Sequence, residues 1–379
     1  MNPLRYQSPN FTPCTRIAGF DMDWTLIRTK SGRIFPKTPD DWTLLHKNVA
    51  PRVQALHADG YAICIFTNQE GVSKGRVKAE ELAIKFTKLG TALGVPILCQ
   101  AATQNDVFRK PRTGMWTLLE TEWKAKYGII VDRVKSLYVG DAAGRPSYSV
   151  SKRKKDFHDV DYKFAVNVDV GLFAVPEECF QTGEYVPDKL TWTLHVPEAF
   201  VPTKFVSSTG THDNDYASMP MIDPTKAALW LCVGPPAAGK STFCAIYSSD
   251  VASINQDTLK TRAKCMNRAK AELIKGKPCI VDGTHRDIAT RAHYIHIAKE
   301  LQVPCYCLWF DRSKDIAMHM NALRMLTGGA HVPKVAMNTY FKRAEPPQMV
   351  EGFTSIMKVP WRAKFTSEEV RTLAGQYLV

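Results

Sequence analysis

The chain has 379 residues, of which 45% are hydrophobic and 23% charged, and its formal net charge is +13. This composition is that of a soluble globular protein, and the sequence contains no run approaching the roughly 18 to 20 apolar residues that would cross a bilayer, so a membrane-spanning protein is excluded. The length exceeds the roughly 250 residues that a single core usually supports, which predicts two domains. The basic excess suits a polyanionic partner such as nucleic acid.

The opening residues and the cysteines give information about the cellular compartment of the protein. The sequence "MNPLRYQSPNFTPCTR" lacks the apolar core of a secretory signal. The ten cysteines include no C-x-x-C pair, and several stand inside apolar runs that resemble strands. We therefore expect reduced thiols and an intracellular, reducing compartment.

Short apolar runs alternate with helix-like stretches up to about residue 205. Strands are expected at residues 16–27, 61–68, 95–103, 136–144 and 164–173, with amphipathic helices at 48–60 and 77–94. This alternation indicates a parallel sheet with helices on its faces. Polar residues at the strand ends would then lie where open α/β sheets bind their ligands.

The alternation is interrupted by a polar, aperiodic stretch and then begins again. Residues 206–222 are the expected linker between a first domain, 1–205, and a second domain, 223–379. In the second domain, strands are expected at 227–234, 251–257, 278–284 and 303–310. The predicted fold class is α/β, with two parallel-sheet domains.

In the second domain, "GPPAAGKS" follows an apolar strand, precedes a possible helix and matches the phosphate-binding pattern G-x-x-x-x-G-K-[ST]. Gly234 and Gly239 would let backbone N–H groups converge on phosphate oxygens at the helix N-terminus, where Thr242 also lies. Lys240 would reach the terminal phosphates, and the Ser241 hydroxyl would join the shell of Mg²⁺. The motif predicts binding of a nucleoside triphosphate.

Four further residues of this domain are candidates, each with two open interpretations. Asp257 could accept the proton of an attacking hydroxyl, or it could cap the following helix. Asp282 could hold magnesium through water, or it could end a strand in a turn. Arg291 and Arg324 could neutralise a transferring phosphoryl group, or they could be surface residues.

The first domain carries Asp21-x-Asp23-x-Thr25 at the end of its first strand. Strand alternation sends Asp21 and Asp23 to one face, where they repel each other unless a cation or a shared proton is present. Such a pair suits magnesium-dependent phosphotransfer, in which Asp21 attacks phosphorus and Asp23 protonates the leaving oxygen. A strand-end turn is the alternative.

Three residues farther along the chain strengthen the phosphotransfer hypothesis. Thr67 ends a strand and could bind the phosphoryl group, Lys110 offsets crowded anions, and Asp141 ends another strand and would complete the magnesium site. This order of acid pair, hydroxyl, lysine and later acid resembles the haloacid dehalogenase superfamily of phosphatases.

The whole chain, from about residue 15 to about residue 362, resembles the eukaryotic polynucleotide kinase 3′-phosphatases. The resemblance is carried by "TNQEGVSKGR", "FRKPRTGMW", "YVGDAAGRP", "KKDFHDVDYKFAVNV", "GPPAAGKSTF", "INQDTLK" and "EPPQMVEGF". It implies a dehalogenase-like phosphatase that removes a 3′-phosphate, followed by a P-loop kinase that phosphorylates a 5′-hydroxyl with ATP. Together these activities prepare DNA breaks for ligation. RNA or a small phosphorylated metabolite as the main substrate, and an inactive end-binding scaffold, are the alternatives.

The resemblance also implies roles for single residues. In the phosphatase, Asp21 is the nucleophile and Asp23 the acid/base. In the kinase, Asp257 is the general base. The remaining assignments are Thr67, Lys110 and Arg291 for catalysis; Gly234, Gly239, Lys240, Ser241, Thr242 and Arg324 for ATP; Asp21, Asp23, Asp141 and Ser241 for Mg²⁺; and Lys74, Arg76 and Arg109 for the DNA strand.

Several features depart from the family pattern. The phosphatase motif begins near residue 20, so docking to phosphorylated scaffolds through a forkhead-associated domain is not expected. "MHMNALRM" has Arg324 but Ala322 where a second arginine is expected, and after Asp141 no carboxylate follows until Asp156. We expect a monomer in the nucleus, with the mitochondrion as a second compartment.

Trp24 stands between the second aspartate and the threonine, where relatives commonly have glycine. The chemistry does not need glycine there if the backbone keeps a negative φ. The indole is expected either to pack in the core beside the site or to stack on a nucleobase at its entrance.

Overall fold

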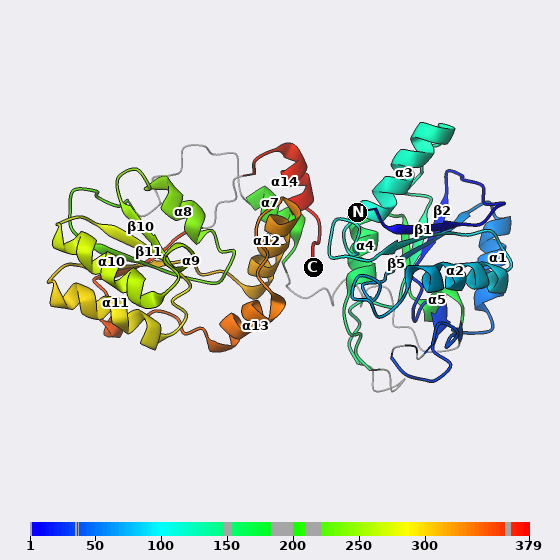
Figure 1. The fold of residues 1–379 in the computed structure, drawn as a ribbon. Coiled ribbons are helices and arrows are strands. Elements are labelled where there is room, and N and C mark those ends of the chain that lie inside the picture. The colour runs from blue at the N-terminus through cyan, green and yellow to red at the C-terminus, as the bar shows by residue number, and fades with distance from the viewer. Residues whose placement is uncertain are drawn as a thin grey trace. The chain divides into compact units, whose positions relative to one another are not determined.

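A computed structural model describes residues 2–34, 36, 38–147, 154–182, 200–208, 221–360 and 365–379. The chain divides into two compact units, Met1–Ala199 with Gln376–Val379, and Phe200–Gly375 (Figure 1). Each unit contains one main sheet with helices on both faces, which confirms the predicted α/β class. None of the described helices combines the length and apolar character that a membrane span requires.

The sheet of the first unit has the strand order β1-β6-β5-β2-β7-β8. Its strands are β1 (Leu4–Gln7), β2 (Ile17–Phe20), β5 (Ala62–Asn68), β6 (Leu98–Ala102), β7 (Leu137–Val139) and β8 (Leu172–Ala174). All neighbours are parallel except β1, which pairs antiparallel with β6. A separate pair joins β3 (Ile27–Arg28) to β4 (Thr43–Leu44). The sequence had not indicated β1.

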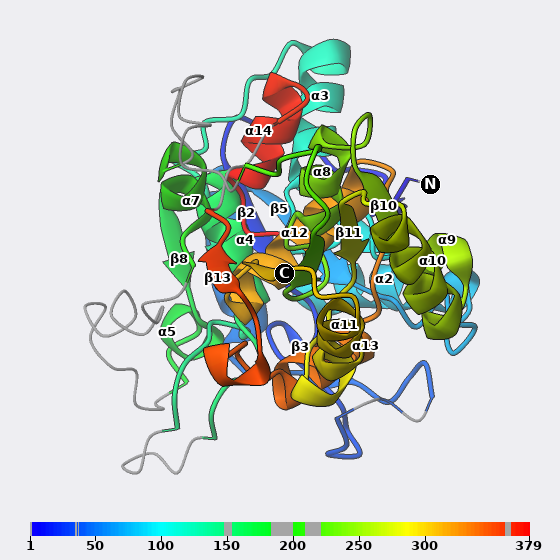
Figure 2. The ribbon, with the colours of Figure 1, turned by 90° about the vertical axis from the view of Figure 1, so that its left-hand side faces the viewer.

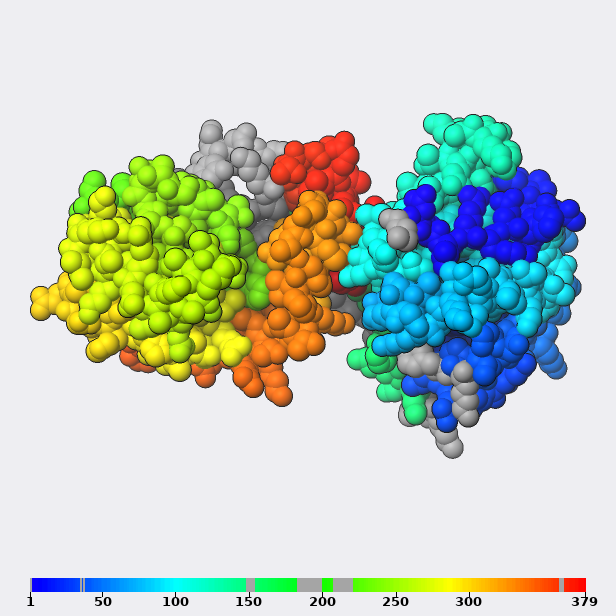
Figure 3. Space-filling model, in the orientation of Figure 1, coloured from blue at the N-terminus to red at the C-terminus, as the bar shows by residue number. Residues whose placement is uncertain are grey.

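Helices bury both faces of this sheet, which is why its inner strands are continuous apolar runs. One core cluster joins residues of α1 (Val49–Ala58) and α2 (Ala79–Leu93) to Phe20 and Ile65, and the other joins α3 (Gly114–Tyr127) and α4 (Val160–Val168) to Phe66. Helix α2 also lies beside β1, as the visible face in Figure 3 shows. The short helix α5 (Pro176–Cys179) follows β8.

The strand predicted at 164–173 was wrong for most of its length. Residues 160–168 form α4, and only Leu172–Ala174 form a strand. A short apolar run does not distinguish a buried strand from a buried helix. Here Asp161, Phe164, Ala165 and Val168 are the buried residues, at helical spacing. This helix carries Asp161 into the interior.

The sheet of the second unit is parallel throughout, in the order β10-β11-β9-β12-β13. Its strands are β9 (Leu229–Val233), β10 (Ala252–Asn255), β11 (Cys279–Asp282), β12 (Cys305–Trp309) and β13 (Ser355–Lys358). The first four agree with the predicted strands, and β13 was not anticipated. Figure 2 labels three of these strands, β10, β11 and β13.

The helices of the second unit again cover both faces. Residues of α10 (Arg262–Ile274) and α11 (Ile288–Glu300) pack in one core cluster, and residues of α8 (Lys240–Ile246) pack in the other. The remaining helical segments are α9 (Gln256–Leu259), α12 (Lys314–Leu326), α13 (Lys334–Arg343), the 3₁₀ turn η2 (Met349–Glu351) and α14 (Glu368–Ala374).

The boundaries of the units differ from the predicted domains. Helix α7 (Pro202–Ser208), expected at the end of the first domain and in the linker, belongs to the second unit and contacts α14. The Phe205 ring lies 5.8 Å from the His319 ring, which ties this segment to α12. At the other end of the chain, Gln376–Val379 belong to the first unit. Most of the predicted linker, residues 209–220, lies outside the described residues.

Candidate active sites

Three carboxylates meet at the carboxyl edge of the first sheet. Asp21 directly follows β2, Asp141 follows the neighbouring strand β7, and Asp161 reaches the same point from the first turn of α4. One carboxylate oxygen of each lies within 4.8 Å of the others. Gly140 permits this approach, because a Cβ atom at that position would lie 2.4 Å from Cβ of Asp161.

The ammonium group of Lys110 lies among these carboxylates. Its Nζ is 2.6 Å from Asp21 Oδ1, 2.7 Å from Asp161 Oδ1 and 2.9 Å from the Tyr138 hydroxyl oxygen. Burial opposes the charge on Lys110, but the attraction of Asp161 and Asp21 outweighs it and raises the Lys110 pKa. The lysine is therefore charged throughout the physiological range and compensates part of the negative charge.

The remaining negative charge makes this site suitable for a cation. Burial, followed by repulsion from Asp161, raises the pKa of Asp21 to about 7 although Lys110 lowers it. Burial and repulsion from Asp161 and Asp21 also raise the pKa of Asp141. Hard oxygen ligands crowded in this way fit Mg²⁺, which relieves the repulsion that otherwise favours protonation.

Asp23 lies outside this carboxylate cluster, although we had included it among the metal ligands. Its side chain is 45% exposed, its Oδ1 is 3.3 Å from Lys85 Nζ, and its Oδ2 accepts a hydrogen bond of 2.7 Å from Gln69 Nε2. The same Gln69 amide donates to the hydroxyl of buried Thr67 at 2.9 Å. Gln69 thus links the accessible carboxylate of Asp23 to Thr67.

Trp24 has a positive φ, not the negative value that a substitute for glycine was supposed to keep, and its indole does not pack in the core. Its φ is +63°, a left-handed conformation that costs a residue with a side chain roughly 1–2 kcal/mol. Its N–H donates to the Ile27 carbonyl at 2.7 Å, which closes the turn. The side chain is 38% exposed, so the core-packing interpretation is wrong. Strained residues held in this way concentrate at functional sites.

The three residues predicted to contact a nucleic acid strand gather around Glu70. Lys74 Nζ lies 2.9 Å from Glu70 Oε1, and Arg109 Nη2 lies 3.9 Å from Glu70 Oε2. A hydrogen bond from Lys74, together with the charges of Arg109, Lys74 and Arg76, lowers the pKa of Glu70. Arg109 Nη1 is buried and has no hydrogen-bond partner among the described residues. The Arg109 side chain as a whole is 29% exposed, so a partly accessible basic group lies next to Lys110 in the sequence.

Sequence reasoning missed Asp161, Tyr138 and Gln69. Asp161 stands 20 residues after Asp141 and just before the run 164–173 that was predicted as a strand, whereas Asp156 is the first carboxylate after Asp141 in the sequence. Asp156 instead pairs with Arg145 at 2.8 Å. A correct helix assignment would have placed Asp161 in a first turn with a buried helical face, which was the signal that could have identified it.

In the second unit, the predicted phosphate-binding loop joins β9 to α8. Gly239 has φ +89°, which glycine adopts readily, and it directly precedes the helix. Lys240 Nζ donates to the carbonyl oxygens of Gly234 at 3.1 Å and Pro235 at 2.5 Å. Burial lowers the pKa of Lys240 to about 8. An incoming phosphate would replace these carbonyl contacts and favour the charged form.

Ser241 is joined to the carboxyl end of β11. Its hydroxyl donates to Asp282 Oδ2 at 2.6 Å, and Asn255 Nδ2 donates to the same oxygen at 2.9 Å. Asp282 is buried and belongs to the strand itself. A hydroxyl and a carboxylate at the foot of a phosphate loop fit Mg²⁺ bound together with a nucleotide. Thr242 follows in α8 and is exposed.

The helix-cap interpretation of Asp257 is wrong. Asn255 is the N-cap of α9, and its side-chain oxygen accepts the hydrogen bond from the Asp257 N–H at 2.6 Å. The Asp257 carboxylate is exposed and accepts no hydrogen bond from a described residue. It is therefore accessible to an external hydroxyl.

The two candidate arginines of this unit have opposite surroundings. The charge of Arg324 contributes to lowering the Lys240 pKa, and its buried Nε lacks a partner among the described residues. Arg291 is fully buried and makes two hydrogen bonds with Glu351, at 2.7 and 2.8 Å. Its Nη1 donates to the carbonyls of His285 and Glu345. The donor groups of Arg291 are therefore used in structural contacts. The structure does not support the role that we expected for it, which was to neutralise the phosphoryl group being transferred.

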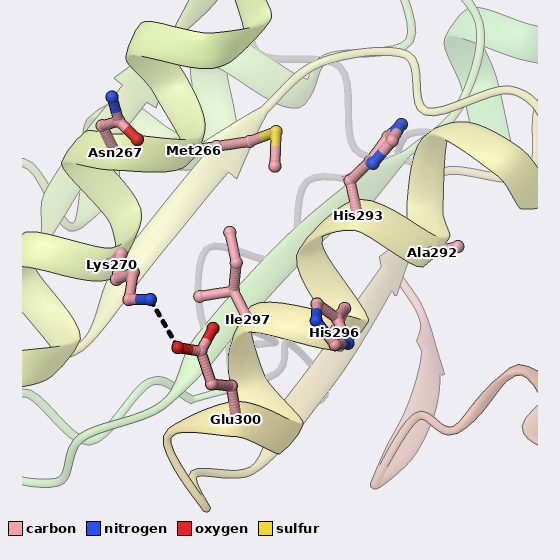
Figure 4. A pocket seen from close by; sticks show the side chains of 8 residues that line it. All are labelled: Met266, Asn267, Lys270, Ala292, His293, His296, Ile297 and Glu300. Carbon is pink, nitrogen blue, oxygen red and sulfur yellow. Dashed lines mark hydrogen bonds and ion pairs between the residues drawn. The ribbon is translucent and has the colours of Figure 1, made fainter.

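A surface groove of about 360 Å³ lies between α10 and α11. Figure 4 shows its side chains, with Lys270 and Glu300 paired across it at 2.5 Å. The groove is lined by residues that include Met266, Asn267, Lys270, His293, His296 and Glu300. It contains no residue of either phosphate-handling site, so we do not assign it to the chemistry.

Comparison with known proteins gives a separate family match in each of the two units. The family model described as "Polynucleotide kinase 3 phosphatase" matches residues 16–180, and the one described as "AAA domain" matches residues 229–347. A bifunctional polynucleotide phosphatase/kinase of Schizosaccharomyces pombe is 33% identical over 351 residues, which are 92% of this chain and 80% of that protein. A protein of Acanthamoeba polyphaga mimivirus, provisionally given the same name, is 29% identical over 374 residues, 93% of this chain and 86% of its own.

A third relative matches the first unit alone. The polynucleotide 3′-phosphatase of Saccharomyces cerevisiae is 30% identical over 215 residues, which are 43% of this chain and 87% of that protein.

The raised pKa of Asp21 predicts competition between Mg²⁺ and a proton. Below about pH 7 the metal has to displace the proton of Asp21, and the raised pKa of Asp141 adds to this competition, so its affinity for the nucleotide-free protein should fall by at least about tenfold per pH unit as the pH drops below 7. Calorimetric titration at pH 6, 7 and 8, in buffers of different ionisation enthalpy, measures both affinity and proton release. Asp21→Asn should weaken this dependence. Equal affinity at pH 6 and pH 8 would contradict the prediction.

The buried pair of Arg291 and Glu351 predicts a large loss of stability when it is broken. Glu351→Gln leaves a buried guanidinium without its counter-charge and should lower the free energy of unfolding by about 3–5 kcal/mol. The matched control is Glu300→Gln, which breaks the exposed pair with Lys270 and should leave the free energy of unfolding almost unchanged. Urea unfolding measures both, and similar small losses would contradict the structural role of Arg291.

Proposed function

The chain belongs to the family of bifunctional polynucleotide phosphatase/kinases, and from this premise we propose that it repairs nucleic acid ends. It is an enzyme with two activities, a polynucleotide 3′-phosphatase in the first unit and an ATP-dependent polynucleotide 5′-hydroxyl kinase in the second. The observation that carries the proposal is that each unit contains a phosphate-handling group of side chains of its own.

In the phosphatase, the proposed nucleophile is a carboxylate oxygen of Asp21. It attacks the phosphorus of the 3′-phosphate, and the bond from phosphorus to the sugar 3′-oxygen breaks while Asp23 gives that oxygen a proton. Water then attacks the aspartyl-phosphate, Asp23 takes the proton from this water, and inorganic phosphate leaves. The exposure of Asp23 and its contact with Gln69 support this proton-transfer role.

Charge compensation in this site comes from groups that the fold brings together. Lys110 holds Asp21 and Asp161 and offsets the incoming phosphate, and the proposed role of the Thr67 hydroxyl, which accepts a hydrogen bond from Gln69, is to bind a phosphoryl oxygen. When bound, Mg²⁺ supplies Lewis-acid stabilisation of phosphoryl charge, and Asp21, Asp141 and Asp161 are the residues that would hold it.

In the kinase, the proposed base is Asp257. It takes the proton of the 5′-hydroxyl as that oxygen attacks the γ-phosphorus of ATP, the bond to the β-phosphate oxygen breaks, and ADP leaves. Lys240 and Arg324 neutralise phosphate charge, with Gly234 and Gly239 allowing the loop to surround the phosphates. Ser241 and Asp282 would hold Mg²⁺ bound with ATP. Arg291 has no part in this proposal.

The two opposed reactions become complementary on the two sides of one break. Ligation requires a 3′-hydroxyl and a 5′-phosphate, which are the products of the two reactions. We propose DNA breaks in the nucleus as the physiological substrate, with Lys74, Arg76 and Arg109 contacting the strand that enters the phosphatase. The net charge of +13 and the unpartnered Nη1 of Arg109 support a polyanionic substrate over a small metabolite.

Single substitutions should separate the two activities. On a nicked duplex with a 3′-phosphate and a 5′-hydroxyl, Asp21→Asn should abolish phosphate release and spare transfer of labelled phosphate from ATP. Lys240→Ala should do the reverse. Loss of both activities from either change would refute independent sites, and absence of both in the unaltered protein would refute the enzyme. The same assay with an RNA strand tests the substrate class, since faster turnover of RNA would favour that alternative.

Trp24 tests whether the phosphatase recognises the terminal base. If the indole stacks on that base, Trp24→Gly should slow turnover of a 3′-phosphorylated oligonucleotide by about 5- to 150-fold, the equivalent of roughly 1–3 kcal/mol for one stacked base. An oligonucleotide whose terminal nucleotide is abasic should be turned over equally by both proteins. Trp24→Phe, which keeps an aromatic face, is the matched control. Equal loss on both substrates would show that Trp24 shapes the site without contacting the base.

A further inference from the structure

Four residues at the end of the sequence contact the phosphatase unit. Residues 376–379 follow directly after α14 and Gly375 of the second unit, yet they belong to the first. Leu378 is fully buried, and Lys163 Nζ donates to the carbonyl oxygen of Val379 at 2.9 Å. We call residues 376–379 the tail.

Asn167 on α4 is hydrogen-bonded both to the tail and to the segment that carries Lys110. Its side-chain oxygen accepts the Tyr377 N–H at 2.8 Å, and its Nδ2 donates to the Tyr377 carbonyl at 2.8 Å. The same Nδ2 donates to the carbonyl of Pro111, also at 2.8 Å. One amide group therefore joins the tail to the residue that follows Lys110.

Arg112 makes a second connection. Its Nε and Nη2 donate to the Leu378 carbonyl at 3.1 and 2.9 Å, and its Nη1 donates to Asn105 Oδ1 and to the Asp106 carbonyl. The residue is 4% exposed, and burial lowers its pKa to about 10. Since no carboxylate pairs with this guanidinium among these contacts, neutral oxygens satisfy it, and Leu378 provides two of the four hydrogen bonds. Without the tail, two buried donor atoms would lose their partner, which is costly for a charged group.

The segment held in this way begins at a residue of the phosphatase site. Lys110 itself is fixed by Asn68, which accepts its N–H at 2.9 Å and donates to its carbonyl at 3.2 Å. Three consecutive residues, 110 to 112, are thus held by Asn68, by Asn167 and by the tail. Displacement of a reacting or charge-compensating group by about 1 Å can reduce turnover by about 100-fold.

We propose that the tail is a positioning element of the phosphatase, which holds the segment 110–112 so that Lys110 reaches Asp21 and Asp161. The inference rests on the proposed phosphatase function of the first unit. The tail touches none of the reacting groups and acts through Asn167 and Arg112. Its presence also means that the phosphatase site depends on residues that follow the kinase unit in the sequence.

The test compares the full chain with a variant that ends at Gly375. The variant should lose about 10- to 100-fold in kcat for release of 3′-phosphate, with KM for the oligonucleotide changed little, because Lys110 acts mainly on the reacting groups. Its kinase activity should stay within about twofold. Hydrogen exchange should accelerate at the backbone N–H groups of residues 110 and 112–114 and remain unchanged in the second unit. This readout does not require phosphatase activity.

Two further variants keep the proposal falsifiable. Asn167→Ala should reproduce the loss, and combining it with the deletion should cost much less than the product of the two single effects, because both break the same connection. Gln376→Ala is the matched control, since its side chain has no hydrogen-bond partner among the described residues and the backbone contacts of Tyr377 and Leu378 remain. It should behave like the unaltered chain.

The outcomes separate this inference from the proposed function. Unchanged phosphatase kcat in a folded, kinase-active deletion variant would overturn the positioning role, as would fully multiplicative effects of the two changes. If the deletion variant does not fold, the result for Asn167→Ala decides. Lack of 3′-phosphatase activity in the unaltered chain would instead refute the proposed function, while the exchange measurement would still report whether the tail holds residues 110–114.

Discussion

The buried ammonium group of Lys110 is the interaction on which the first unit depends. Asp21 and Asp161 lie within 2.7 Å of its Nζ, and this positive charge opposes the effect of burial, which raises the pKa of Asp21. Even with the lysine in place, the pKa of Asp21 rises to about 7. The site therefore keeps an excess of negative charge in the absence of a metal, and a ligand that adds positive charge would relieve it. A carboxylate in that state can be a nucleophile only when its proton has been removed.

Several contacts in the unit hold the short segment 110–112, which carries Lys110. Asn68 fixes Lys110, Asn167 holds the next residue, and Arg112 is bound to the tail. Gly140 gives Asp161 the space to approach from α4. The second unit also contains a buried lysine, but the partners of that lysine are uncharged. Its Lys240 donates to neutral carbonyls, and burial lowers the pKa of this lysine to about 8. The negative charge of a bound phosphate would favour the charged form of the lysine.

The predicted residues that the structure brings to the two candidate sites are close to strand ends or inside a contiguous loop motif. Asp21, Thr67 and Asp141 each lie at or near the end of a parallel strand, and Lys240 and Ser241 belong to one eight-residue pattern. Local periodicity was enough to place such residues at the carboxyl edge of a sheet. No local periodicity of this kind indicated the surroundings of Arg291 or Trp24. The partner of Arg291 is 60 residues away, and the conformation of Trp24 depends on the turn that it shares with Ile27.

The sequence by itself determined the α/β class, the phosphate loop, the acid pair and the family resemblance, because short-range spacing encodes strands, loops and their end residues. Only the tertiary structure decided that Asp161 joins Asp21 and Asp141, that Asp23 turns toward Gln69 and Lys85, and that the last four residues pack on the phosphatase unit. These are contacts between residues far apart in the chain. Their formation depends on packing and on the compensation of buried charge, which no local pattern specifies.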